Sequence, residues 1–313
     1  MDFAAASVSG TQTNVKGTTV SQTLGQSATS VINITSVEDL GGGMKATAHY
    51  GLDPRTLSND AGAIGRDELF VGVSGGFGNI RLGSPNSIGL TTFLAASPLG
   101  TGVGSGYGAT AGDYSSVRYS RSARYDSPSF SGLTVSLLVA PGNDQTVVTG
   151  TVPAQLIANA RAVTEIGLRY DNGPLTIAYA NVSQAAQTNT ANAKTSTNIL
   201  AASYALGATV LSAGWNDGDA LASTSTTVAQ KSEGYRVGVA HTMGAITLRA
   251  SQAEQKTNLI KETVTGLRAD YALSKRSTVY MGYENWDNKN ATLSATVNSG
   301  DRKITSVGVK HTF

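Results

Sequence analysis

The chain has 313 residues, of which 40% are hydrophobic, 14% are charged and 36 are glycine, and its formal net charge is +2. An ordinary soluble protein carries about 25% charged residues, and a disordered chain combines few apolar residues with a high net charge, so neither class fits. The balanced charge argues against a nucleic-acid partner, and the absence of cysteine excludes disulfides and thiolate metal sites. No apolar stretch approaches the roughly 18 to 20 residues that a membrane-spanning helix needs.

Several segments alternate apolar and polar residues with a period of two, which predicts β-strands that have one apolar face. In Leu133–Val139, for example, the leucine and valine side chains at every second position share a face, opposite threonine and serine. The other segments with this pattern are Ile166–Tyr170, Tyr235–Val239, Ile246–Ala250 and Val307–Phe313.

Two kinds of connection alternate along the chain. Short turns are predicted at 39–43, 75–78, 126–132, 171–174, 206–207, 243–244 and 273–276. Long loops rich in Asn, Thr, Gly and Ala are predicted at Asn181–Lys194, Asp217–Lys231 and Asn285–Gly300.

A ring side chain stands before most of the short turns and at the end of the chain, which marks an internal repeat. These residues are Tyr125, Tyr170, Tyr204, His241, Tyr271 and Phe313. Their average spacing of about 38 residues predicts roughly eight hairpins, or sixteen strands, in 313 residues.

The apolar face decides between two all-β classes. A soluble sandwich buries that face in a core, whereas a membrane barrel turns it toward lipid and has aromatic girdles at both interfaces. Ring residues at one strand end, with short turns on one side and long loops on the other, favour the barrel. We therefore predict a single domain over residues 1–313, an all-β, sixteen-stranded antiparallel transmembrane β-barrel.

Four segments resemble the general porins of Gram-negative outer membranes, in particular the beta-proteobacterial branch. They are Glu38–Ala46, Phe70–Gly83, Arg124–Gly132 and Val307–Phe313. The resemblance implies a homotrimer in outer-membrane lipid and lipopolysaccharide that lets small hydrophilic solutes diffuse passively. It also implies that a loop over about Ser84 to Ser116 folds into the lumen as a constriction, and that Phe313 is the assembly signal.

The chain also departs from this family. Such porins begin with a strand that runs into the equivalent of Asp2 and Phe3, so we expect a truncated N-terminus and a short closing strand. The family often has cations where Val31, Thr35 and the Ser84–Pro85 pair fall, so the constriction here is expected to differ.

Nine cations fall on the polar face, where a membrane barrel must keep them because a charge facing lipid costs about 2 to 4 kcal/mol at mid-depth. They are Lys45, Arg81, Arg118, Arg124, Arg169, Arg236, Arg249, Arg268 and Lys310. The acids on the same face are Asp126, Glu165, Asp171, Asp270 and Glu284. The difference of nine and five, +4, predicts a mild preference for anionic or neutral solutes.

We expect Arg81 and Arg118, which flank the inserted loop, to dominate the filter, with Lys45, Arg236 and Arg249 completing the wall. Arg124 and Arg169 are also expected to line the pore, although each can pair with an aspartate two residues later. The loop segment 87–111 has no charge and Asp113 is its first acid, so it predicts a weak transverse field. Arg121 falls on the lipid side, which suggests a bulge or a subunit interface.

Two glycine motifs and three histidines offer little chemistry. Residues 72–76 match the G-x-S-x-G elbow of hydrolases, but a second strand follows the turn, and the glycine-rich segment 104–109 is not followed by a helix. His49, His241 and His311 are too scattered for a metal site, so we interpret them as structural or solvated. We predict no catalytic residue, metal or cofactor. An outer-membrane barrel enzyme, such as a protease or lipase, and a soluble all-β adhesin or binding module remain alternatives.

Overall fold

The computed structural model describes residues 2–10, 22–25, 30–53, 65–105, 117–142, 161–185, 194–222, 225–257, 260–289 and 302–313. The chain forms one antiparallel sheet with a single helix, α1 (Ile88–Ala95), among the described residues. The strands are β1 (Asp2–Gly10), β2 (Gln22–Gly25), β3 (Ile32–Gly41), β4 (Met44–Asp53), β5 (Gly65–Gly75), β6 (Gly78–Ser84), β7 (Ser122–Asp126), β8 (Leu133–Ala140), β9 (Val163–Asn172), β10 (Leu175–Gln184), β11 (Thr195–Leu206), β12 (Thr209–Ala222), β13 (Ser225–Met243), β14 (Ile246–Thr257), β15 (Ile260–Ala272), β16 (Ser277–Lys289) and β17 (Arg302–His311).

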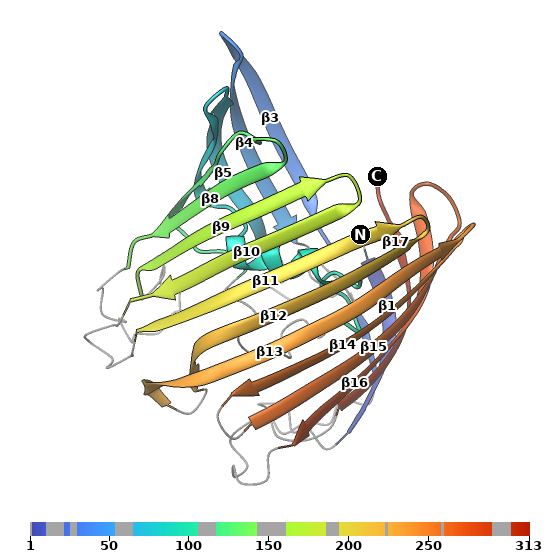
Figure 1. Cartoon of the computed structure of the whole chain (residues 1–313). Helices are drawn as coiled ribbons and strands as arrows, with labels where there is room; N and C mark the ends of the chain where they lie inside the picture. The colour runs from blue at the N-terminus through green and yellow to red at the C-terminus, as the bar shows by residue number, and fades with distance from the viewer. Residues whose placement is uncertain are drawn as a thin grey trace, which may run out of the picture.

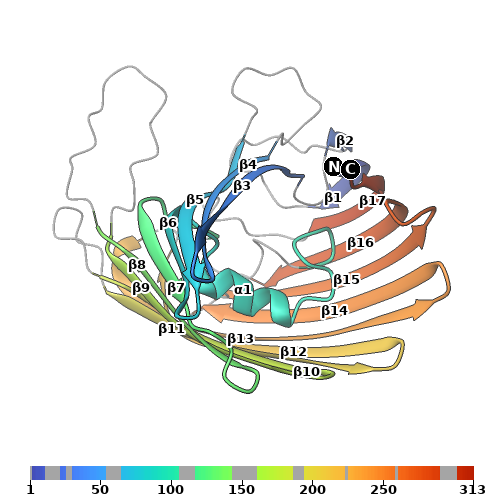
Figure 2. The same ribbon diagram turned by 90° about the horizontal axis from the view of Figure 1, so that it is seen from above.

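The sheet closes on itself as a barrel (Figures 1 and 2). From β3 to β17 each strand pairs with the next, and β1 pairs with β17 from Asp2 opposite Lys310 to Gly10 opposite Arg302. The short β2 pairs with β1, and β3, the next strand along the chain, pairs with β4. When β2 and β3 are counted as one strand position, the barrel has the predicted sixteen strands.

The closing strand was expected to be short, and this expectation is wrong. All nine residues of β1 pair with β17, a length close to the about 9 to 11 residues of a typical transmembrane strand. At this seam β1 is paired on both sides, with β17 along its whole length and with β2 from Ala4 to Ser7.

The predicted short turns all join strands at one end of the barrel. All seven predicted short turns fall between consecutive strands, from the turn after Gly41 to the turn before Ser277. One predicted loop is largely strand, because β12 runs to Ala222 and β13 begins at Ser225. Likewise β16 continues to Lys289, so only the later part of the predicted loop that starts at Asn285 lies beyond a strand.

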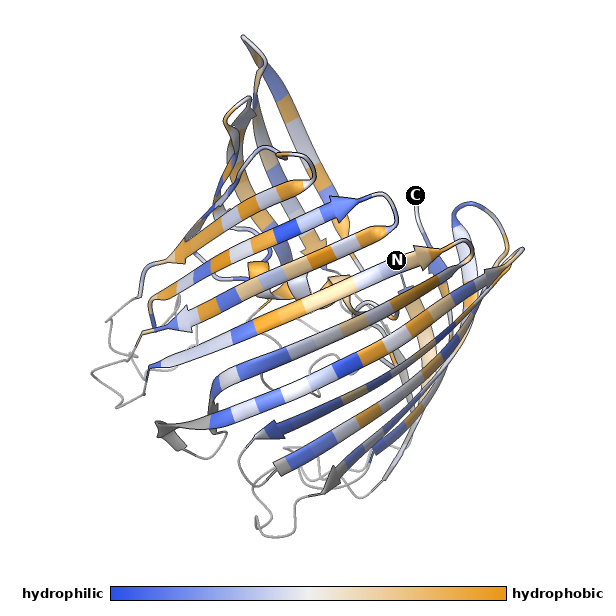
Figure 3. Cartoon of the chain, in the orientation of Figure 1, coloured by the Kyte–Doolittle hydropathy of each residue, from blue (hydrophilic) through white to orange (hydrophobic). Residues whose placement is uncertain are grey.

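The outer surface of the barrel is apolar. Along β8, Leu133, Val135, Leu137 and Val139 are 37 to 42% exposed, whereas Ser136 and Leu138 between them are buried. This alternation recurs along the other strands as bands of opposite hydropathy (Figure 3). The prediction that the apolar face points outward is therefore confirmed.

The inner surface is not uniformly polar, which the period-two pattern did not predict. Leu138, Ala140, Val163, Val182 and Ile199 point inward and are buried together. Ile88 of α1 packs on the same cluster, because the helix lies inside the barrel against β8 to β11 (Figure 2).

Aromatic side chains mark both ends of the outer surface. Tyr204 and Tyr271, near the short turns, are 43% and 48% exposed, and Trp215 and Tyr235 form a cross-strand pair farther along β12 and β13. Such girdles are typical of barrels at the two interfaces of a membrane. No helix in the described part of the chain is long and apolar enough to cross a bilayer.

Candidate pore constriction

Residues 85–105 enter the barrel and are called here the inserted segment. The helix α1 lies in the first half of this segment. Ser87 caps the helix, since its extended backbone leaves the side-chain oxygen free to accept a hydrogen bond from Leu90 N at 3.0 Å. Pro98, three residues after the last helical position, cannot continue a helix. The helical residues between them are mostly apolar and are buried at Ile88, Leu90 and Phe93.

The inner wall leaves room for this helix where a strand has no side chain. Gly167 of β9 points inward beneath the helix, and a Cβ atom there would overlap the Ile88 side chain. A larger residue at position 167 would therefore push the helix away from the wall. The helix in turn excludes water from the inner apolar cluster, a burial that stabilises by about 25 cal/mol for each Å² of apolar surface.

Three wall carboxylates bind backbone amides of the inserted segment. Glu68 accepts from Asn86 N at 2.8 Å, Glu165 from Ile88 N at 2.5 Å and Glu284 from Gly104 N at 2.9 Å. Glu165 and Glu284 are almost fully buried. Each contact gives a buried or partly buried backbone amide a hydrogen-bond acceptor that it would otherwise lack, so the three contacts hold both ends of the segment.

Three wall arginines bind the carbonyl oxygens of the same segment. Arg124 donates to Asn86 O at 2.8 Å, Arg249 donates to Pro98 O at 2.8 Å, and Arg236 donates to Ser105 O. Arg236 also lies over the ring of Phe93, 4.0 Å from its centre. Arg124, Arg236 and Arg249 thus face the inserted segment, and each binds one of its carbonyl oxygens.

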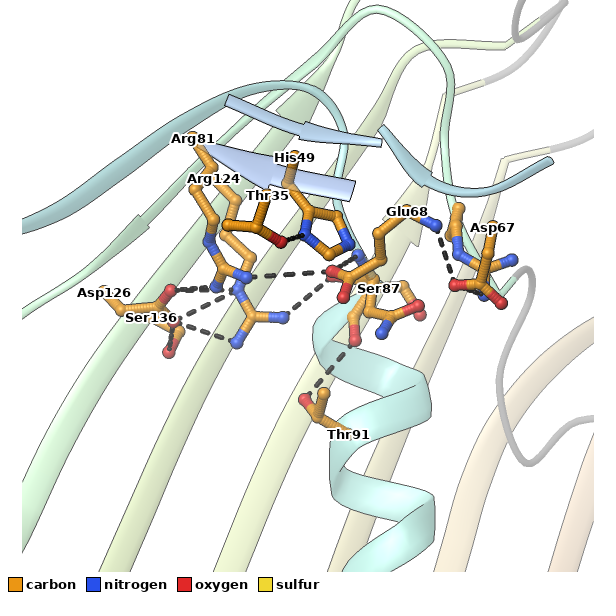
Figure 4. Close-up of polar contacts among 12 residues, drawn as sticks. Thr35, His49, Asp67, Glu68, Arg81, Ser87, Thr91, Arg124, Asp126 and Ser136 are labelled. Carbon is orange, nitrogen blue, oxygen red and sulfur yellow. Dashed lines mark hydrogen bonds and ion pairs between the residues drawn. The ribbon is translucent and has the colours of Figure 1, made fainter. Parts of the chain in front are cut away.

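Beside the start of the helix, three arginines and three acids form a cluster (Figure 4). Arg81 pairs with Asp126 and lies 3.8 Å from Glu68, while Arg124 binds Asp126 at 2.9 Å. Arg118 binds Asp67 at 2.6 Å, and an isolated bridge joins it to Asn86. We call Asp67, Glu68, Arg81, Arg118, Arg124 and Asp126 the constriction cluster; its formal charges cancel.

Two of these acids were missed in the sequence. Glu68 lies on the same face of β5 as the inward Phe70, so extending the alternation backward by one step would have found it. The alternation could not have predicted that Asp67 faces the lumen, because a register shift between Tyr50 and Leu52 of β4 disturbs the pairing beside it. Asp39, which lies opposite Lys45 across the ladder, adds a third acid to Asp67 and Glu68. These three acids bring the predicted net charge of the lumen face, +4, much closer to zero.

The remaining predicted pore-lining residues lie apart from the constriction. Arg169 binds Asp171 at 2.7 Å close to a short turn, and Lys45 is exposed at the same end of the barrel. Asp113 lies outside the described residues. Arg121 is not at a bulge within a strand but in a turn before β7, where its φ of 56° is left-handed.

His49 is the one histidine on the lumen side, opposite Thr35 and Phe70 in neighbouring strands. Its Nδ1 lies 2.9 Å from Thr35 Oγ1, and its ring stacks on Phe70 with centres 5.1 Å apart. The part of the chain that the structure describes contains no group of three or more His, Asp or Glu side chains that could hold a metal ion.

A family model for Gram-negative porins matches residues 1–291, and the chain therefore belongs to the Gram-negative porin family. It is also similar to outer membrane porin protein 32 of Delftia acidovorans, with 26% identity over 309 residues that cover 91% of this chain and 85% of that protein.

Solved porin structures share the fold. The anion-selective porin from Comamonas acidovorans superposes with a TM-score of 0.77 at 22% identity, covering 100% of this chain and 97% of that chain. OmpT of Vibrio cholerae, in its trimer form, has a TM-score of 0.67 at 14% identity, covering 98% and 97%.

Family and fold together define an outer-membrane porin, a channel and not an enzyme. In such barrels the short turns are periplasmic and the long loops extracellular. The N- and C-terminal strands, β1 and β17, both have their free ends at the periplasmic side.

Proposed function

We propose that this porin passes small hydrophilic solutes by passive diffusion, with a mild preference for anions over cations. The observation that carries the preference is the set of exposed cations near the periplasmic end that form no ion pair with any described residue: Lys45, Lys275, Arg276 and Lys310. Of the described acids at this end, Glu38 and Asp39 are also without an ion pair, and Asp2 lies opposite Lys310 across the ladder. The net charge of these groups at the periplasmic end of the pore is positive, and a confined pore entrance with positive charge attracts anions.

The preference should be mild because the narrow part of the pore is balanced. Each arginine of the constriction cluster has a carboxylate partner, and the inserted segment 85–105 brings no charge of its own. Exposed charges are also screened over about 8 Å at physiological ionic strength. The anion-selective porin from Comamonas acidovorans, a structural relative, is in keeping with this sign of selectivity.

A reversal-potential measurement under a salt gradient tests the preference. The unmodified channel should favour chloride over potassium, and Lys45→Gln with Lys310→Gln should reduce that ratio. Lys303→Gln is the matched control, because Lys303 is an exposed cation on the outward face of the same strand as Lys310. Clear cation selectivity of the unmodified channel would contradict the proposal.

We also propose that the porin is a homotrimer in a lipid and lipopolysaccharide bilayer and that β3 to β6 contribute to the subunit contact. A groove of about 420 Å³ runs over their outer face, lined by small residues such as Ser36, Ala46 and Ala48 and by apolar Val71 and Leu82. Glu38 lines the same groove, although a carboxylate facing lipid is unfavourable. Native electrophoresis in detergent should show a trimer that heating dissociates, and Ala48→Arg should weaken it; an unheated monomer would contradict the assignment.

A further inference from the structure

We propose that His49 adjusts the ion specificity of this pore, because protonation of its imidazole increases the preference for anions that the periplasmic cations create. The inference rests on the proposed diffusion function and deepens it. His49 is half-buried on the lumen side of β4, and Figure 4 shows it among the residues around the constriction cluster.

Contacts link the imidazole to the cluster through one aromatic ring. The ring centre of Phe70 lies 5.1 Å from that of His49, in stacked geometry, and 5.5 Å from the guanidinium carbon of Arg81. Arg81 in turn contacts Glu68 and Asp126. A charge on His49 therefore acts on the same stretch of the pore as the cluster.

The local hydrogen bond permits both protonation states. The Thr35 hydroxyl can donate to Nδ1 of a neutral ring or accept from Nδ1–H of either form. Among the described residues nothing hydrogen-bonds Nε2. The ring can therefore gain a proton and keep its hydrogen bond to Thr35. Histidine is the side chain whose charge ordinarily changes between pH 5 and 8.

The fixed charges described around His49 nearly balance, so one added proton is a large change in the local charge. The charged groups on the lumen side of the elements around His49 are Asp39 of β3, Lys45 and Asp53 of β4, Asp67 and Glu68 of β5, Arg81 of β6, Arg124 and Asp126 of β7, and Arg118 before β7. Four are cations and five are anions. A protonated His49 offsets the excess negative charge of this set.

The other two histidines provide matched controls. His241 and His311 each have Nδ1 beside a hydroxyl of the neighbouring strand, Thr209 at 2.7 Å and Ser277 at 2.9 Å. Both point to the outer face of the barrel, as do the apolar residues that alternate with them, Val237 and Val309. The three sites thus share a hydroxyl group beside Nδ1 and differ in the face they occupy.

The test is the reversal potential of the purified channel in a planar bilayer under a potassium chloride gradient, measured from pH 8 to pH 5. The anion-to-cation permeability ratio should rise by about twofold to fivefold on acidification, the effect of one unit charge roughly 8 Å away in water. His49→Gln should remove this rise, and His49→Arg should give the higher ratio already at pH 8. His241→Gln and His311→Gln should titrate like the unmodified channel.

A rise that persists in His49→Gln would assign the titration to another group, such as Glu165, and would overturn the proposal. An unmodified channel with no pH dependence would overturn it equally. Loss of diffusion itself is a separate result, because it would appear as absent conductance at every pH in the unmodified protein. Heat-modifiable migration on electrophoresis confirms that each variant is folded before recording.

Discussion

The individual charges of the lumen act mainly by holding structure. Arg236 and Arg249 bind carbonyl oxygens of the inserted segment, and Glu165 and Glu284 bind its amides. A buried charge without a partner destabilises the folded protein. Removing one member of a buried pair therefore leaves the other charge unpaired and destabilising. Charge near the constriction must therefore be counted with its partners and not residue by residue.

Arg81 provides the test at this scale. Arg81→Ala leaves the constriction cluster with one excess negative charge, so the anion-to-cation permeability ratio should fall by about twofold to fivefold, by the Coulomb estimate for one unit charge in water. Reversal potentials measure the ratio. Asp126→Asn should shift it in the opposite direction, and the double variant should return toward the starting value. Arg121→Ala, which removes a cation from an exposed turn, should change little; equal shifts in both arginine variants would contradict the cluster.

Among the elements, α1 depends on its contact with the wall. The helix is short, and isolated helices of fewer than about 12 residues are marginal in water. Its position therefore comes from the Ser87 cap, the Glu165 contact and the space above Gly167.

Gly167→Leu should displace α1 from β9 and make the open-channel current larger or noisier, because the new side chain would occupy the place of Ile88. Single-channel recording measures the amplitude and its variance. Ala202→Leu, on the outer face of β11, introduces the same side chain outside the barrel and should leave the current unchanged. A current unchanged by Gly167→Leu would contradict the helix placement.

Strands and turns were predictable because their signals are local. Period-two alternation located the strands and glycine-rich turns located the short connections, as at 41–43 and 173–174. The lumen contacts were less predictable because they join residues far apart in sequence, such as Gly104 and Glu284. The inward apolar cluster could not be predicted for a further reason. Leu138 breaks the apolar–polar alternation, and an apolar residue on the lumen side is explained only by the helix that covers it.

For the whole molecule, the end of the chain bears on assembly. We propose that Phe313, which is 90% exposed and packs edge-on against His311 at 4.8 Å, serves as the assembly signal. Deleting Phe313 should reduce the yield of folded barrel in the outer membrane much more than Thr312→Ser. Heat-modifiable migration of membrane fractions measures this yield. Equal yields would assign the signal elsewhere.

The barrel, the inserted segment and the paired charges together describe an open channel with a fixed, nearly neutral constriction. The most direct measurement is the current through a planar lipid bilayer to which purified protein is added. We predict discrete conductance steps that are linear in voltage at low potential and a reversal potential with a mild anion preference. A protein that is inserted and folded but gives no steps, or that is strongly cation-selective, would contradict the account.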